Sequence, residues 1–387
     1  MKNILITGAG VLLGFGFAYF IIFYTSLLPF RIQTSSSVLI NPISPKKTVI
    51  GFLPYWLLDK ASYDYSKYIT TLTYFGLRID TDGTILKLTS PTQEEPGWNA
   101  LSSGKADAFL QNALEKHVKL SLLVSSGDND SINQLVSNPI NHAKNLIDSV
   151  SPILIKYRFS DLNLDIEYTQ MASPAARTNF SDFVKNVRRY LPSQFTLTVE
   201  ISGNDVIKPY LIDPKEMGKI ADNVVLMAYD FHSPSSFVSG PVAPIGGAGI
   251  MSEYDVTSAT EKAIAQIPNA KLILGIPLYG YEWETLSPLP RSADIPNSGV
   301  VASNRRAEEL LSTCTNCEVH TDTDAMEKYI TYYDSSTGTY HIIFYPDQSS
   351  TISKINLANN LDLGGIALWA LGYEGNTILN PLVGFAK

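Results

Sequence analysis

Four polar side chains alternate with aliphatic ones in the segment 159–167. They are Asp161, Asn163, Asp165 and Glu167, separated by Leu or Ile. Side chains of a β-strand alternate between its two faces, so all four share one face if this segment is a strand. Two carboxyl groups this close push their pKa values apart, which would keep one of them protonated near neutral pH. Because burying such groups is costly unless they are paired or functional, the row predicts an acid–base site.

The row lies in one of eight short apolar runs, which cover 48–56, 69–77, 118–126, 159–167, 195–202, 223–230, 271–280 and 364–371. Runs rich in Val, Ile, Leu and Phe are typical of parallel strands buried on both faces. Helical patterns such as 176–191 and 252–267 separate several of them. This alternation predicts an α/β fold, a (β/α)8 TIM barrel, and no G-x-G-x-x-G motif follows the first run to favour an open dinucleotide-binding sheet.

In a barrel, the polar row points inward, and Glu167 lies at the carboxyl end of its strand, where barrel enzymes keep their active sites. The alternative is an edge strand with a solvated polar face. The neighbouring runs offer no matching polar face, and we therefore favour the barrel interior.

The spacer between the last two runs is long and has strand-like and helical pieces of its own at 303–314, 328–345 and 350–361. The piece 328–345 has D-S-S-T-G at its centre, which predicts a β-hairpin. We expect a small α+β insertion at 284–350 within a barrel that spans 48–387.

The N-terminal segment 4–30 contains no charged residue. A membrane-spanning helix needs about 20 apolar residues, whereas a signal peptide has a shorter apolar core and a small-residue cleavage site. The sequence predicts a retained membrane anchor at 1–30 and a linker at 31–47, with a cleaved signal or a buried helix as alternatives. Arg31 and the lysines near the end of the linker would place the barrel in the cytoplasm by the positive-inside rule. We expect an extracytoplasmic barrel instead, because of the chemistry that the strand-end motifs described below imply.

Composition narrows the class of protein. The 387 residues carry a net charge of −8, which disfavours nucleic acid as a partner. Cys314 and Cys317 form a lone C-x-x-C; a zinc site would need two more ligands and only His320 is near, so a local disulfide is the main alternative. No P-loop or G-x-S-x-G motif is present. We predict neither a metal nor a cofactor.

Motifs at four strand ends resemble those of glycoside hydrolase family 18, the chitinase family. The segment 159–167 is similar to its F-D-G-x-D-x-D-x-E signature, and M-A-Y-D at 227–230 is similar to its M-x-Y-D. G-I-P-L-Y-G at 275–280 and G-G-I-A-L-W at 364–369 resemble its last two strands. The sequences Y-G-Y-E-W at 279–283 and G-G-I-A-L-W-A-L-G-Y-E resemble the spore-germination branch, which acts on wall polymers containing N-acetylglucosamine.

The resemblance implies a role for each matching residue. Glu167 would be the general acid/base, and the 2-acetamido carbonyl of the substrate would attack the anomeric carbon in place of a protein nucleophile. Asp165 would orient that acetamido group, and Tyr229 would donate a hydrogen bond to it. Trp369 would form the floor of the subsite. Further candidates for substrate contact are Asn163, Asp230, Met227, Tyr279, Tyr55, Trp56 and Trp283, for which core packing, loop capping and rim packing are the alternatives.

The chain also departs from the family pattern. Ser160 and Asp161 stand where family enzymes usually carry Asp and Gly, and Asn163 replaces the first Asp of D-x-D-x-E. That aspartate normally exchanges a proton with the second one. Asn163 can form a hydrogen bond with Asp165 but cannot titrate, so we expect activity with an altered pH profile.

Together these features predict a membrane-tethered, retaining glycosidase. Its substrates would be β-1,4-linked N-acetylglucosamine polymers, either peptidoglycan fragments or chitin-like oligosaccharides. A catalytically inactive, lectin-like sugar-binding protein on the same barrel is the alternative. A structural barrel without a ligand would not explain why the row of acidic side chains points inward, since burying them is costly.

Overall fold

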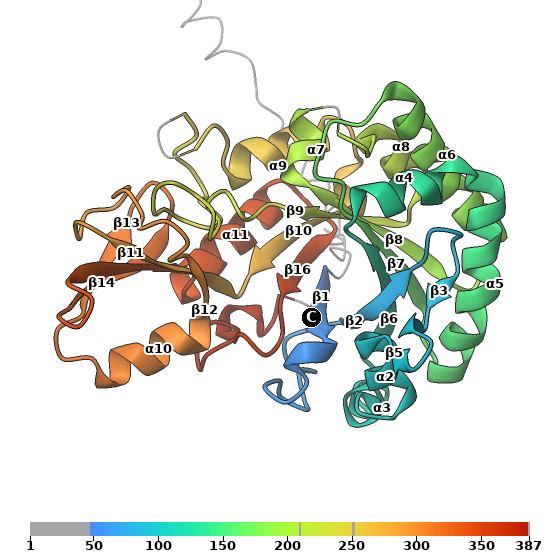
Figure 1. Cartoon of the computed structure of the whole chain (residues 1–387). Helices are drawn as coiled ribbons and strands as arrows, with labels where there is room; N and C mark the ends of the chain where they lie inside the picture. Colours follow the sequence, from blue (N-terminus) through green and yellow to red (C-terminus); the bar gives the residue numbers. More distant parts are fainter. Residues whose placement is uncertain (1–46, 209, 250–251, 386–387) are drawn as a thin grey trace, which may run out of the picture. The chain divides into compact units, whose positions relative to one another are not determined.

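Eight parallel strands close into a barrel in the computed structural model, which describes residues 47–208, 210–249 and 252–385 (Figure 1). The strands are β1 (Thr48–Pro54), β2 (Thr71–Ile79), β6 (Lys119–Ser126), β7 (Asp161–Ile166), β8 (Thr196–Ser202), β9 (Asn223–Met227), β10 (Leu272–Pro277) and β16 (Gly365–Trp369). Strand β1 pairs with both β2 and β16, which closes the ring. Each of the eight predicted runs overlaps one barrel strand, so the predicted barrel is confirmed.

The predicted anchor at 1–30 and nearly all of the linker at 31–47 lie outside the described residues. Within the described ranges, no helix is long and apolar enough to cross a membrane.

The two faces of a barrel strand point toward different surroundings, as the sequence of β7 illustrates. Its aliphatic residues Leu162, Leu164 and Ile166 belong to the large core between the barrel and the outer helices. A second, smaller cluster fills part of the barrel interior and consists of Ile50, Phe52, Leu123, Val225, Ile273 and Ala367. None of its members comes from β7 or β8, where polar side chains take the inward positions. The barrel interior is therefore apolar on one side and polar on the other.

Helices follow most barrel strands. They are α2 (Pro96–Ser102), α3 (Asp107–Glu115), α4 (Asn129–Ser137), α5 (Pro139–Tyr157), α6 (Pro174–Tyr190), α7 (Gly203–Ile207), α8 (Pro214–Ile220), α9 (Val256–Ile264) and α11 (Gln348–Asn360). The predicted helix at 176–191 corresponds to α6, which begins at a Ser173 side chain that accepts a hydrogen bond from the Ala176 N–H, with Pro174 in the first turn. Short strands β3 (Ile85–Leu86), β4 (Leu88–Ser90) and β5 (Gln93–Glu94) follow β2.

A second, antiparallel sheet lies between β10 and β16 in the chain (orange, Figure 1). Its strands are β11 (Tyr279–Thr285), β12 (Val300–Ser303), β13 (Glu318–Asp322), β14 (Glu327–Asp334) and β15 (Thr339–Tyr345), and it carries α10 (Asn304–Thr313). Strands β14 and β15 form the hairpin predicted at 328–345. The sheet begins at Tyr279, earlier than the predicted 284, because the chain leaves the barrel after β10 and the predicted run 271–280 is divided between the two sheets.

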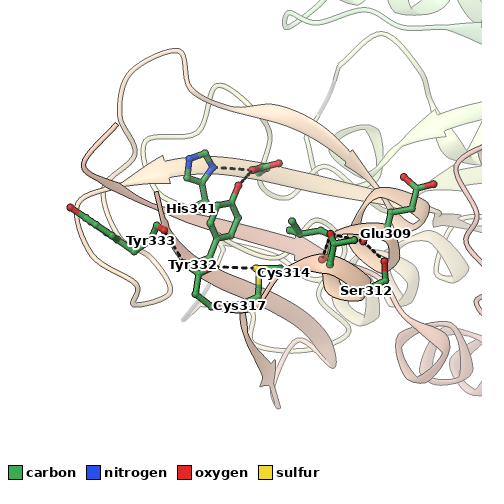
Figure 2. Close-up of a disulfide and its surroundings, with 11 residues drawn as sticks. Glu309, Ser312, Cys314, Cys317, Tyr332, Tyr333 and His341 are labelled. Carbon is green, nitrogen blue, oxygen red and sulfur yellow. Dashed lines mark hydrogen bonds and ion pairs between the residues drawn. A yellow bond between two sulfur atoms is a disulfide. The ribbon is translucent and has the colours of Figure 1, made fainter. Parts of the chain in front are cut away.

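Cys314 and Cys317 are joined by a disulfide at the end of α10 (Figure 2). Neither sulfur is therefore a free thiolate that could bind a metal ion. Of the two alternatives that the sequence left open for this motif, the structure contains the local disulfide.

Candidate active site

The polar row on β7 begins at the amino end of the barrel with Asp161. Its carboxylate accepts hydrogen bonds from Ser121 Oγ at 2.7 Å, Thr196 Oγ1 at 2.5 Å and Thr198 Oγ1 at 3.0 Å. Burial raises the pKa of Asp161 to about 6, although the three hydroxyl donors act against that rise. The expectation that neighbouring strands lack a matching polar face is wrong, because β6 supplies Ser121 and β8 supplies both threonines. These hydroxyls are the partners that the sequence alone did not indicate for Asp161.

Asn163, the next residue of the row, is fully buried. Its Nδ2 donates a hydrogen bond of 2.7 Å to Glu200 Oε1 on β8, rather than to Asp165 as expected from the sequence. Its Oδ1 is buried and has no hydrogen-bond partner within the described part of the chain. Asn163 therefore lies beneath the cleft and contacts a second buried acid, which corrects its predicted role as a direct substrate contact.

Asp165 and Glu167 complete the row at the carboxyl end of β7. Asp165 is buried, and its Oδ1 has no hydrogen-bond partner among the described residues. Burial and the nearby Glu167 raise the pKa of Asp165 well above its ordinary value. Glu167 follows the strand and reaches solvent, yet partial burial, together with Asp230 and Asp205, raises its pKa too. The two predicted catalytic acids thus lie together, in surroundings that favour their protonated forms.

Tyr229 follows β9 and lies close enough to these acids for their charges to act on its hydroxyl. Burial raises the pKa of its hydroxyl well above the ordinary value, and the negative charges of Glu200 and Asp165 add to this effect. The phenol therefore keeps its proton and can act as a hydrogen-bond donor. Gly275 on β10 makes room for the ring, since a Cβ there would lie 2.9 Å from Tyr229 Cε1 and 2.7 Å from a backbone oxygen.

Asp230 is held by two tyrosines of the second sheet. Its Oδ1 accepts hydrogen bonds from Tyr279 Oη at 2.5 Å and from Tyr281 Oη at 2.6 Å. The backbone of Asp230 is left-handed, with φ of 61°, a conformation that Asp tolerates better than most residues. Tyr279, one of the predicted substrate contacts, is buried, and its hydroxyl donates its hydrogen bond to Asp230.

A cleft of about 340 Å³ opens above these residues. It is lined by Glu167, Ser202, Gly203, Asn204, Ile207, Met227, Tyr229, Asp230, Phe231, Ser252, Glu253 and Tyr254. Its volume is within the range of sites that bind small ligands. The cleft brings together four predicted residues from two separate motifs: Glu167 from the first, and Met227, Tyr229 and Asp230 from the second.

The predicted aromatic platforms divide into two groups. Trp369 is partly exposed and packs against Phe52, Phe75 and Trp56 at ring distances of 4.9–6.4 Å, and Tyr55 contacts Trp56. Trp56 is 47% exposed and has a free surface. Trp283, by contrast, is 0% exposed because it lies in the second sheet and packs against Tyr281. The prediction of Trp283 as a sugar platform is therefore wrong.

Two residues that hold this site together were missed at the sequence level, Glu200 and Tyr281. The pattern T-L-T-V-E-I at 196–201 alternates polar and aliphatic residues in the same way as the row on β7, and this signal could have identified Glu200. Tyr281 gave no comparable signal, because its approach to Asp230 depends on how the second sheet meets the barrel.

Comparison with known proteins identifies the family of this chain. The family model "Glycosyl hydrolases family 18" matches residues 48–374. The cortical fragment-lytic enzyme of Bacillus anthracis is 27% identical over 326 residues, covering 81% of this chain and 67% of that protein. The spore cortex-lytic enzyme SleL of Bacillus megaterium has a similar structure (TM-score 0.69, 22% identity, 89% of this chain and 75% of that one). So does a Group IV chitinase of Ostrinia furnacalis (TM-score 0.74, 19% identity, 87% and 98%).

These matches confirm the predicted resemblance, including its spore-germination branch. The family model covers most of the chain and spans the motifs of β7, β9, β10 and β16. The chain belongs to the glycosyl hydrolases of family 18 and is a glycosidase.

Proposed function

We propose that the protein hydrolyses β-1,4-linked polysaccharides that contain N-acetylglucosamine, with retention of configuration. The observation that carries this proposal is the pair of acids at the end of β7, Asp165 and Glu167, together with the protonated phenol of Tyr229 on which their charges act. The names of the relatives support the substrate class, since they include cortex-lytic enzymes and chitinases.

Glu167 is the general acid in this proposal. Its side chain lines the cleft, and its raised pKa favours a carboxylic acid that can protonate the departing glycosidic oxygen. The resulting carboxylate then takes a proton from the water that completes hydrolysis. Both halves of the reaction therefore use one side chain that has access to solvent.

The acetamido group of the substrate acts as the nucleophile, as in the family's substrate-assisted mechanism. Asp165 precedes Glu167 by two residues and therefore lies on the same face. Its carboxylate can accept a hydrogen bond from the acetamido N–H and stabilise the cationic intermediate. Tyr229 donates its phenolic hydrogen to the acetamido oxygen. Trp369 supplies the apolar floor beneath the sugar, next to Trp56.

Peptidoglycan fragments and chitin-like oligosaccharides both offer the required 2-acetamido group. We favour peptidoglycan, because the cortex-lytic enzymes match this chain over about four fifths of its length. We further propose that residues 1–30 anchor the protein in a membrane with the barrel on its outer side. The disulfide between Cys314 and Cys317 supports that side, since disulfides persist in oxidising compartments. Protease digestion of the barrel in intact cells tests the orientation.

A sugar-binding protein without activity is the second candidate, and Asn163 is the observation that favours it. Without a titrating residue at this position, the acid pair lacks the proton partner that family enzymes use. Such a protein would bind the same oligosaccharides and release no product.

Turnover by the purified full chain separates the two candidates. We expect it to release products from muropeptides or chitooligosaccharides, and Glu167→Gln to reduce kcat by a factor of about 10² to 10⁴ while binding persists. Binding without turnover in both proteins would support the sugar-binding candidate and contradict the enzyme.

A further inference from the structure

Glu200 on β8 is a buried acid to which the proposed mechanism assigns no role. Its side chain is 2% exposed, and its Oε1 accepts the hydrogen bond from Asn163 Nδ2. Burial raises the pKa of Glu200 well above its ordinary value, and the charge of Asp165 raises it further. An uncompensated buried carboxyl lowers stability, so its presence beside the site calls for a reason.

The register of the sheet places Glu200 beside Asp165. Strands β7 and β8 pair in parallel, with Asn163 opposite Thr198 and Leu164 opposite Val199. One further step along both strands brings Asp165 level with Glu200, and both side chains take inward positions. The titratable groups that act on Glu200 are Asp161, Asp165, Glu167 and the phenol of Tyr229, and none of these groups is a cation.

Two neighbouring carboxyl groups in such surroundings cannot both ionise at moderate cost, so the pair retains a proton. The unpaired oxygens of the site fit this state. Asn163 Oδ1 and Asp165 Oδ1 are both buried acceptors without a donor in the described part of the chain. A proton held among these groups supplies a donor that the carboxylates alone lack.

We propose that Glu200 is the proton partner of Asp165, in place of the aspartate that family enzymes carry at the position of Asn163. Glu200 is a positioning residue that acts through Asp165, and the inference rests on the proposed function. In the free enzyme, the pair shares one proton. When the acetamido group binds, the proton resides on Glu200 and Asp165 is the carboxylate that faces the substrate. No proton is consumed, because Glu167 supplies and recovers the one used in hydrolysis.

Asn163 has a definite part in this arrangement. Its amide donates to Glu200 Oε1 and thereby fixes the carboxyl beside Asp165 without itself titrating. The departure from the family pattern is thus a transfer of the titrating carboxyl from β7 to the neighbouring strand.

The test compares pH profiles of kcat/KM for the full chain, Glu200→Gln, and the double variant Asn163→Asp/Glu200→Gln. In Glu200→Gln, Asp165 ionises without a competing acid, and we expect the acidic limb to move to lower pH by about one unit. In the double variant, a second carboxyl again faces Asp165, and the limb should return toward that of the wild type. A merely structural role would lower activity at every pH without moving the limb. An unmoved limb in Glu200→Gln, or no return in the double variant, would overturn the proposal.

A second measurement does not depend on activity and keeps the proposal testable if the wild type proves inactive, which would refute only the proposed function. Thermal stability at pH 8 is compared for Asp165→Asn, Glu200→Gln and both together. Each single change removes one of two buried carboxyls whose shared proton is costly to hold at pH 8, so each should stabilise the protein, and the double variant should gain less than the sum. Additive effects would show that the two carboxyls are independent and would refute their shared proton.

Discussion

Buried glutamates occur both in the barrel interior and in the second sheet, and their surroundings are opposite. Glu200 in the barrel is 2% exposed and faces other acids, with an amide as its hydrogen-bond donor. Glu282 in the second sheet is 4% exposed and receives hydrogen bonds from Arg306, Tyr332 and His341. Burial alone would raise the pKa of Glu282, but these donors outweigh it and hold the value at about 2.

This difference distinguishes Glu282, whose ionised carboxylate stabilises the fold, from the acids of the barrel interior, whose surroundings favour protonation. Tyr332 and His341 lie stacked on neighbouring strands and both reach the carboxylate, near the disulfide at the end of α10 (Figure 2). Glu327 of the same sheet also has partners, since it accepts two backbone N–H groups and lies 3.4 Å from Lys354 Nζ, although burial outweighs them and raises its pKa. In the barrel, Asp161, Asp165 and Glu200 have no cationic partner among the described residues, which costs stability and favours their protonated forms.

The largest expected effect comes from changing a barrel acid in the site. Asp165→Asn should lower kcat/KM by a factor of about 10² to 10⁴, because the amide cannot carry the negative charge that stabilises the intermediate. Steady-state kinetics on an N-acetylglucosamine oligomer measure the change. Retention of activity within about threefold would contradict the assignment of Asp165 to the chemistry.

In the second sheet, the corresponding change should act on stability instead. Glu282→Gln leaves Arg306 and His341 without their anionic partner and should lower the free energy of unfolding by about 3 kcal/mol, with kcat of the folded protein unchanged. The contribution of the wild-type carboxylate is present above pH 4.5 and is lost as the pH falls toward 2, since its folded pKa is depressed.

Urea denaturation measures this effect, and Glu318→Gln in β13 is its control. Glu318 is exposed, so the same chemical change there should alter stability by less than about 0.5 kcal/mol. Equal losses of stability in Glu282→Gln and Glu318→Gln would show that the buried contacts of Glu282 do not stabilise the fold.

A smaller effect is expected for Asp161, a barrel acid below the site. Its folded pKa of about 6 lies above its ordinary value, so the folded state binds the extra proton between about pH 4 and pH 6. The wild type should therefore lose on the order of 2 kcal/mol of stability, relative to Asp161→Asn, as the pH rises through that window. Parallel stability curves for the two proteins would show that Asp161 titrates normally.

The smallest effect should come from the disulfide. Cys314 and Cys317 close a loop with two intervening residues, for which loop-closure entropy gives at most about 2 kcal/mol. Reduction should lower the melting temperature slightly and leave turnover unchanged, and a Cys314→Ser/Cys317→Ser variant should not respond to reductant. Loss of activity on reduction would mean that the second sheet shapes the site more directly than proposed.

The sequence was informative wherever a periodic pattern and a strand end coincide. The polar row of β7 and the motif after β9 could be located because alternation fixes the face and the barrel fixes the end at which a site forms. The eight strands could be predicted because each lies in a short apolar run, as is typical of buried parallel strands.

The features of the site that the sequence did not predict depend on contacts between strands and sheets rather than on the local pattern. Glu200 lies beside Asp165 because of the register between β7 and β8, and Trp283 is buried because β11 leaves the barrel for the second sheet. Alternation at 196–201 could have shown that Glu200 faces inward, but the local pattern does not predict that it lies beside Asp165 or that Trp283 is buried.

The most direct test of the contrast between the two regions is a site-resolved titration of side-chain carboxyl groups by carbon-13 NMR, with Asp165→Asn, Glu200→Gln and Glu282→Gln to assign the signals. Asp165 and Glu200 should titrate well above the ordinary range for carboxyl groups, and Glu282 should titrate near pH 2. Titration of all three near pH 4 would contradict the account, because Asp165 and Glu200 would then share no proton.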